Sequence, residues 1–289
     1  MSAPLNYVYL DTVIWNLLCN SSINPQSLRS KLNGNGLEVV FSPHVFYELA
    51  KSFVGTRQMS RQNAPLLLQR FRSFVVAGFP CIQQTPHLLR QEARVANNDQ
   101  EAVSIFETRE NCAFLLKEVD KLSDGIFDER ADGFVSYRKR QVQAFRQESR
   151  EKQYEDRKGL TALPLDQFIR RNWNRYSRQI LKRHLNDVIS ATFESHLTWV
   201  AKRLLLSKSY RVSHAMVRSD LFLTQHRART GSLARDLLDD CYHVVNAAYC
   251  DIYGTCESAQ LKYVPIVLPQ VKFAPYNRNE NLAEWLYAL

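Results

Sequence analysis

Four acidic residues stand at matching places beside predicted strands: Asp11, Glu48, Asp240 and Glu257. Carboxylates that converge on one cleft repel one another and raise each other's pKa unless a cation neutralises them. A set of oxygen ligands without a His or Cys cluster favours Mg²⁺ or Mn²⁺. Such an ion activates water and stabilises negative charge on a phosphoryl oxygen. These residues therefore predict metal-dependent hydrolysis of a phosphodiester.

The elements that must position these acids alternate between strand and helix, which is the signature of a parallel α/β sheet. Asp11 ends the first strand, and Glu48 lies on a helix after the second. Asp240 lies on a helix before the strand at 251–255, and Glu257 follows that strand. The carboxyl ends of parallel strands share one edge of a sheet, so the four acids can converge there. The alternative role for Asp11 is to cap the next helix. The predicted strands are at 7–11, 38–41, 79–82 and 251–255, with final strands or edges at 264–268 and 271–273. The predicted helices are at 12–20, 64–77, 231–250 and 280–288, and further helices begin at residues 25, 43 and 85. Residues 213–230 are predicted to be a basic loop.

The middle of the chain has a different pattern. From residue 97 to 206 strand signals vanish, and apolar residues recur every three or four positions among Glu, Gln, Lys and Arg. This spacing predicts long helices inserted into the α/β core. We therefore divide the chain into a first half of the core at 1–96, a basic helical insertion at 97–229, and a second half with a C-terminal helix at 230–289.

The positive charge of the chain is concentrated in the insertion. Residues 138–183 hold 14 Lys and Arg against 5 Asp and Glu, a surplus as large as the net charge of +9 of the whole chain. A basic surface with interleaved aromatic residues suits neutralisation of a nucleic-acid backbone. A solvated helical face is the alternative. The residues expected to position substrate are Arg138, Lys139, Arg140, Arg170, Arg171 and Arg175.

The order of these motifs resembles a PIN domain. The resemblance rests on Leu10-Asp11-Thr12, Ser42-Pro43 through Tyr47-Glu48-Leu49, Asp240-x-x-His243 with Ala247, and the run from Asp251 to Glu257, and it covers residues 5–92 and 230–275. It implies a three-layer α/β/α fold, an acidic pocket that holds Mg²⁺ or Mn²⁺, and hydrolysis of RNA, as in bacterial toxin or RNA-processing nucleases. By position, Asp11, Glu48 and Asp240 match the first three acids of the family.

Glu257 departs from the family pattern, because it stands where an Asp is usual. This departure leaves open whether Glu257 binds metal directly or through water. Thr255 matches the hydroxyl at the strand end, and Asp251 is an extra acid and a further candidate ligand. Asp239 is about 100° around the helix from Asp240. We expect Asp240 to face the cleft and Asp239 to face solvent.

Histidine and cysteine residues enter this prediction only in supporting roles. The spacing of Cys241, His243, Cys250 and Cys256 matches no zinc-finger or zinc-ribbon pattern. We expect His243 to pack in its helix layer or to support a ligand, and His44 to be structural. The six cysteines are spread thinly, which favours reduced thiols in a cytoplasmic protein. No apolar run approaches the length of a transmembrane helix, so no membrane partner is expected.

The sequence thus predicts a Mg²⁺- or Mn²⁺-dependent endoribonuclease with a basic wall that holds single-stranded or structured RNA. Two alternatives stay open: a catalytically impaired module of the same fold that binds nucleic acid or protein, and a structure-specific DNA nuclease. An inhibitory protein partner and a homodimer are further partners that the sequence leaves open.

Overall fold

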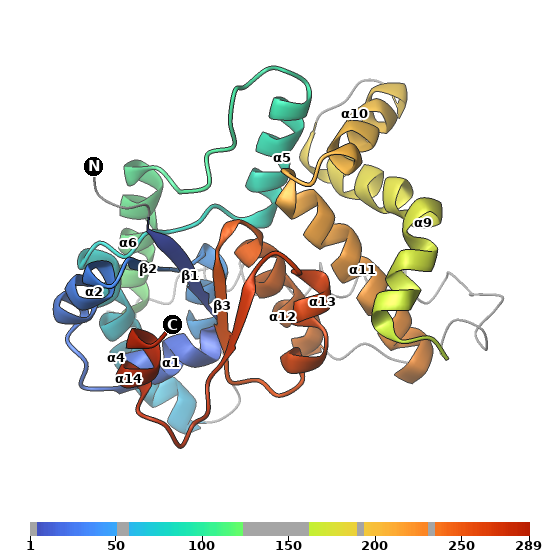
Figure 1. Ribbon diagram of the computed structural model, residues 1–289. Coiled ribbons are helices and arrows are strands. Elements are labelled where there is room, and N and C mark those ends of the chain that lie inside the picture. Colours follow the sequence, from blue (N-terminus) through green and yellow to red (C-terminus); the bar gives the residue numbers. More distant parts are fainter. Residues whose placement is uncertain (1–4, 51–57, 124–161, 190–193, 231–234) are drawn as a thin grey trace.

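The computed structural model describes residues 5–50, 58–123, 162–189, 194–230 and 235–289. Its centre is a sheet of four parallel strands in the order β2-β1-β3-β4 (Figure 1). The strands are β1 (Asn6–Leu10), β2 (Leu37–Val40), β3 (Ile252–Thr255) and β4 (Lys272–Pro275). The predicted α/β fold with a parallel sheet is confirmed.

The register places the strand ends side by side. Tyr9 of β1 pairs with Val40 on one side and with Tyr253 on the other. The pairing extends past the end of β1, because Asp11 donates its backbone N–H to Gly254 O at 3.1 Å. Asp11 therefore leaves the sheet at the carboxyl edge, next to the end of β3.

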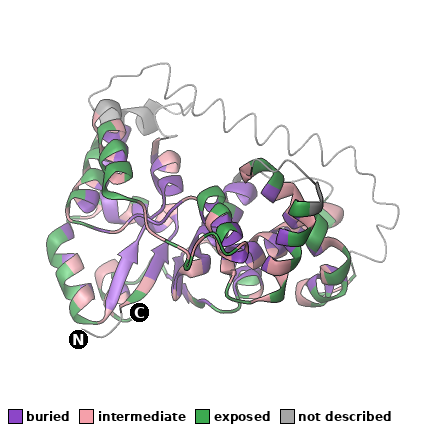
Figure 2. Cartoon of the chain, turned by 90° about the horizontal axis from the view of Figure 1, so that it is seen from above, coloured by how far each residue is buried: buried purple, intermediate pink, exposed green. Residues whose placement is uncertain are grey.

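Helices cover both faces of the sheet, so the predicted three layers are present. Val8, Leu10 and Ile252 face one apolar core, and Tyr9 and Tyr253 face the other. Figure 2 shows the buried strands between the two groups of helices. The first group is α1 (Thr12–Asn20), α2 (Pro25–Gly34), α3 (Pro43–Ala50), α4 (Gln58–Val76), α6 (Arg109–Ser123) and α14 (Leu282–Tyr287). The second group is α5 (Thr85–Ala96), α9 (Leu165–Val188), α10 (Glu194–Leu206), α11 (Arg211–Thr230), α12 (Arg235–Asn246) and α13 (Val264–Val267), with short 3₁₀ turns η2 (Ala247–Tyr249) and η3 (Gln260–Lys262).

The first core is centred on a fully buried tryptophan. The Trp15 ring meets Phe41, Phe71, Phe74 and Phe79 in edge-to-face geometry, with ring centroids 5.6–6.0 Å apart. Such aromatic pairs each contribute about 0.5–1.5 kcal/mol beyond their buried area. This packing holds α1, and therefore its first residues beside the carboxyl edge, against α4.

The helical insertion shares a core with the sheet. Helices α9, α10 and α11 pack on one another and on α5, and their apolar residues form one cluster with Tyr9 and Tyr253. Helix α6, by contrast, packs on α4 at the opposite face of the sheet. The described helices of the insertion therefore contribute to both helix layers (Figure 1).

Three predicted elements differ in the structure. Residues 79–82, expected as a strand, belong to none of the four strands, and Cys81 and Ile82 form isolated β-bridges with Phe41 and Phe106. Residues 213–230, expected as a basic loop, belong to helix α11, whose Val212, Leu221 and Leu223 are buried. Its N-terminus is stabilised from another element, because the buried Glu92 carboxyl accepts the backbone N–H groups of Val212 and Ser213, each at 2.8 Å. Residues 264–268 were expected as a strand or edge, but 264–267 form the short helix α13, and the last strand is β4.

In the described ranges, no helix combines the length and apolar character needed to cross a membrane.

Candidate acidic active site

Asp11 is both a helix cap and a buried acid at the carboxyl edge. Its Oδ1 accepts the Ile14 N–H at 3.0 Å, which caps α1, and its Oδ2 accepts the Thr255 hydroxyl. Only 2% of the residue is exposed. Burial raises the pKa of Asp11 to about 6, although both hydrogen bonds lower it. The two roles considered for this residue are therefore compatible.

Thr255 joins Asp11 to the loop that carries Glu257. Its Oγ1 accepts the Glu257 backbone N–H at 3.0 Å while its own proton goes to Asp11. The negative charge of Glu257 contributes to the raised pKa of Asp11. The hydroxyl that the sequence singled out thus links the Asp11 carboxylate to the backbone of the loop that carries Glu257.

Asp240 lies close enough to the other three acids for their charges to affect its pKa. That pKa is raised to about 7, chiefly by burial; proximity to His243 lowers it, and the charges of Glu48, Asp11 and Glu257 contribute to the rise. We call Asp11, Glu48, Asp240 and Glu257 the acidic cluster. They come from the end of β1, from α3, from α12 and from the loop after β3, as the sequence predicted.

Two neighbouring acids differ from expectation. Asp239 is 3% exposed and does not face solvent; because α12 packs against both α5 and α11, more than one face of this helix is covered. Asp251 was a candidate metal ligand, but it precedes β3 at the amino edge of the sheet. Its Oδ2 accepts the Tyr7 N–H at 2.8 Å. Asp251 therefore closes the opposite end of the sheet and is not part of the acidic cluster.

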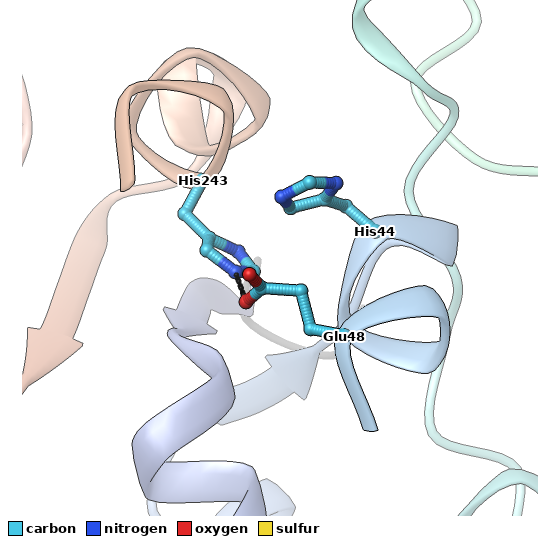
Figure 3. A group of neighbouring side chains, drawn as sticks. All are labelled: His44, Glu48 and His243. Carbon is cyan, nitrogen blue, oxygen red and sulfur yellow. Dashed lines mark hydrogen bonds and ion pairs between the residues drawn. The ribbon is translucent and has the colours of Figure 1, made fainter. Parts of the chain in front are cut away.

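His243 lies at the centre of the polar contacts around Glu48. Its Nε2 lies 2.7 Å from Glu48 Oε2 and 2.8 Å from Thr12 Oγ1. The His44 ring stands edge-on to the His243 ring, with centroids 4.5 Å apart. Figure 3 shows the three side chains His44, Glu48 and His243 turned toward one another, from α3 and α12. The supporting contact of His243 with Glu48 agrees with the expectation for that residue, whereas His44 was expected only to be structural.

A chain of buried hydrogen bonds fixes the other side of the His243 ring. Its Nδ1 lies 2.8 Å from the Tyr9 hydroxyl, which lies 2.8 Å from Ser42 Oγ. Asn246 Nδ2 donates to Ser42 Oγ at 3.2 Å, and Asn246 Oδ1 accepts the backbone N–H and the hydroxyl of Thr85 at 3.1 and 2.7 Å. A backbone N–H can only donate, so it determines the orientation of the Asn246 amide.

A cation beside the cluster was missed in the sequence. Arg278 lies in the loop between β4 and α14. Proximity to Cys256, Glu257 and Asp11 raises the pKa of its guanidinium. An isolated Arg in a polar loop gives no sequence signal, because its proximity to Asp11 depends on the β3–β4 pairing.

The predicted basic residues divide into two groups. Arg138, Lys139 and Arg140 lie outside the described residues. The other three, Arg170, Arg171 and Arg175, are exposed on α9. There Arg170 pairs with Asp166 one turn away, and Arg175 lies over the Tyr176 ring, 5.0 Å from its centroid.

The donor set of the acidic cluster suits a hard divalent cation. Its members offer carboxylate oxygens, and the pKa values of Asp11 and Asp240 are raised to about 6 and about 7, first by burial. A cation between them would remove the repulsion that raises these pKa values. The oxygen donors of the acidic cluster fit the chemistry of Mg²⁺ or Mn²⁺, whereas the group whose ligand atoms lie within 4.8 Å of one another in the described residues is His44, Glu48 and His243.

Comparison of the chain with protein-family models, with curated proteins and with solved structures finds no match.

Proposed function

We propose that this protein is a metal-dependent nuclease of PIN type that cleaves RNA. The proposal is supported by the placement of four acids, from four separate elements, toward the carboxyl edge of a parallel sheet, and by the rise in the pKa of Asp240 to which the charges of the other three contribute. In open α/β sheets this edge is where ligands bind. A basic chain with net charge +9 is suited to a polyanionic partner.

The residues of the chain have distinct roles in this proposal. Asp11, Glu48, Asp240 and Glu257 would hold Mg²⁺ or Mn²⁺, which when bound acts as a Lewis acid on a phosphoryl oxygen. Thr255 holds the Asp11 and Glu257 segments together, and His243 orients Glu48.

Outside the cluster, two further groups would position the RNA backbone. The exposed guanidinium of Arg278 would contact the phosphate next to the acids. The arginines of α9 would bind more distant phosphates.

The test is cleavage of a labelled RNA oligonucleotide in Mn²⁺ by the wild type and by Asp11→Asn and Asp240→Asn. We expect both variants to lose about 100-fold or more in rate, because each removes one anionic group from the charge-stabilising set. Glu101→Gln, an exposed acid in a loop, is the matched control and should cleave normally. Cleavage by Asp11→Asn at the wild-type rate would reject the proposal. A DNA strand of the same sequence, cleaved faster than the RNA, would instead favour a DNA nuclease.

A binding module without catalysis is the second candidate. One observation favours it: both oxygens of Asp11 are already occupied by donors from the protein, and Glu48 is held by His243. Calorimetric titration with Mn²⁺ separates the two, because the nuclease requires metal binding that Asp240→Asn weakens. RNA binding without such metal binding would favour the module, and an inhibitory partner or a second copy of the chain would then be sought.

A further inference from the structure

His44, Glu48 and His243 bring two imidazoles and one carboxylate together at one side of the acidic cluster. One ligand atom from each residue lies within 4.8 Å of the ligand atoms of the other two. The two histidines are 7% and 2% exposed, and Glu48 is partly exposed. The group is therefore largely shielded, with Glu48 on its accessible side.

The group is built on two helices and not on loops. His44 and Glu48 are four residues apart on α3, which places them on the same face of that helix. His243 comes from α12, and its ring points toward the side chains of His44 and Glu48 on α3 (Figure 3). Rigid elements hold ligands closer to a required geometry than loops do.

Coordination of a metal through His243 Nε2 requires the ring proton to lie on Nδ1. A histidine ligand of a metal normally donates its other ring N–H to a partner that fixes the ring and its tautomer. Here Nδ1 faces the Tyr9 hydroxyl at 2.8 Å, and the chain through Ser42 and Asn246 ends on the fixed donor N–H of Thr85. With that proton on Nδ1, His243 donates to the Tyr9 hydroxyl, and Tyr9 in turn donates to Ser42 Oγ, which also accepts the Asn246 amide. The lone pair of Nε2 then lies between Glu48 and Thr12.

We propose that His44, Glu48 and His243 bind a divalent transition-metal ion of the Zn²⁺, Co²⁺ or Mn²⁺ class. Two imidazoles with one carboxylate are a donor set of zinc and iron sites that keep positions open for other ligands, whereas Mg²⁺ prefers oxygen ligands. The ion replaces any proton shared between His243 Nε2 and Glu48, which are 2.7 Å apart, and that proton goes to solvent. The inference shares Glu48 with the proposed nuclease site but does not depend on RNA cleavage.

Co²⁺ titration of the whole chain tests the site, with the visible absorption of the ion as the readout. We expect binding of one ion with d–d bands that Zn²⁺ abolishes and that excess Mg²⁺ leaves intact. The variants His44→Gln and His243→Gln should each weaken Co²⁺ binding by about 10-fold or more. The matched control is His196→Gln, which changes an exposed histidine on α10 and should bind as the wild type does.

Wild-type affinity for Co²⁺ in both His44→Gln and His243→Gln would overturn the proposal. If either variant fails to fold, X-ray absorption of the wild-type protein loaded with Zn²⁺ decides. Imidazole scattering supports the site, and a shell of oxygen alone overturns it. Absence of RNA cleavage in a protein whose Co²⁺ binding depends on both histidines would reject the nuclease and retain this metal site.

Discussion

Replacement of Glu92 by glutamine should detach the start of α11 from α5. The Glu92 carboxyl is fully buried, and each of its oxygens accepts one backbone N–H, from Val212 to Oε1 and from Ser213 to Oε2, both at 2.8 Å. The Tyr249 hydroxyl donates to Oε1 at 2.7 Å, and the Ser213 hydroxyl donates to Oε2 at 2.5 Å. A carboxyl group can serve both backbone donors in either protonation state, because its two oxygens both keep a lone pair for the N–H.

An amide cannot serve both donors. Whichever way the amide of the Glu92→Gln variant is turned, its NH₂ group faces a backbone N–H that can only donate. A buried donor left without an acceptor costs about 1–3 kcal/mol, and the lost hydroxyl bond adds roughly 1 kcal/mol. We therefore expect Glu92→Gln to lower the free energy of unfolding by about 2–4 kcal/mol at pH 5.5.

The difference between the two proteins should narrow at higher pH. Burial raises the pKa of Glu92 to about 7, although its hydrogen bonds to Ser213, Tyr249 and Val212 lower it. In the unfolded chain a glutamate ionises near pH 4.3. Between about pH 4 and pH 7, the Glu92 carboxyl is therefore protonated in the folded protein and ionised in the unfolded chain. The resulting stabilisation is complete below about pH 4 and disappears as the pH rises through about 7. The variant has no such group to titrate.

Urea denaturation at pH 5.5 and pH 8 measures both effects, with Glu101→Gln as an exposed control. Equal unfolding free energies of Glu92→Gln and wild type at pH 5.5 would refute the argument from the two backbone donors. A difference that widens from pH 5.5 to pH 8 would show that the charged carboxylate stabilises the start of α11, and would refute the direction of the pKa shift.

Three further changes test the site and its supports. Burial and like charges raise the pKa of Asp240 to about 7. The free energy of unfolding of the wild type should therefore fall as the pH rises from about 4 to 7. In thermal melts, Asp240→Asn should show a weaker dependence on pH and a smaller stabilisation by Mn²⁺ than the wild type. Gly254→Ala should cost about 1–3 kcal/mol in urea unfolding, because its Cβ would lie 2.7 Å from Leu10 Cδ2, whereas Gly34→Ala meets nothing within 4 Å and should be tolerated. Arg278→Ala should slow RNA cleavage by about 10-fold without weakening Mn²⁺ binding, and an unchanged rate would remove that residue from the proposed phosphate contact.

The fold followed closely from local sequence signals. Asp11 could be placed because an apolar strand ends in it and a helix begins immediately afterwards. The helix that begins at Pro43 and the helix that carries Asp240 could also be predicted, because each has apolar residues at regular helical spacing. The positions of three of the four acids relative to the sheet were therefore implied by element order alone, once the strands were taken as parallel.

The errors have a common cause, which is that long-range contacts decided them. Helix α11 starts where Glu92, more than a hundred residues earlier, supplies the acceptors for its first N–H groups. Asp251 has a side chain that could bind metal, but the pairing of β1 with β3 places it at the amino edge of the sheet. There it accepts the Tyr7 N–H. His243 was expected to support a ligand, but the sequence did not indicate that His44, expected to be structural, would join it and Glu48.

Helix α5 connects the candidate site to the helical insertion. Its first residue, Thr85, fixes the Asn246 amide, which leads through Ser42 and Tyr9 to His243. Two turns later the same helix supplies Glu92, which holds the start of α11. Because one short helix carries both contacts, a displacement of α11 would move the His243 ring through the rigid backbone of α5 and not through a flexible loop. This arrangement gives the insertion a physical role in the site geometry that does not depend on whether its arginines contact RNA.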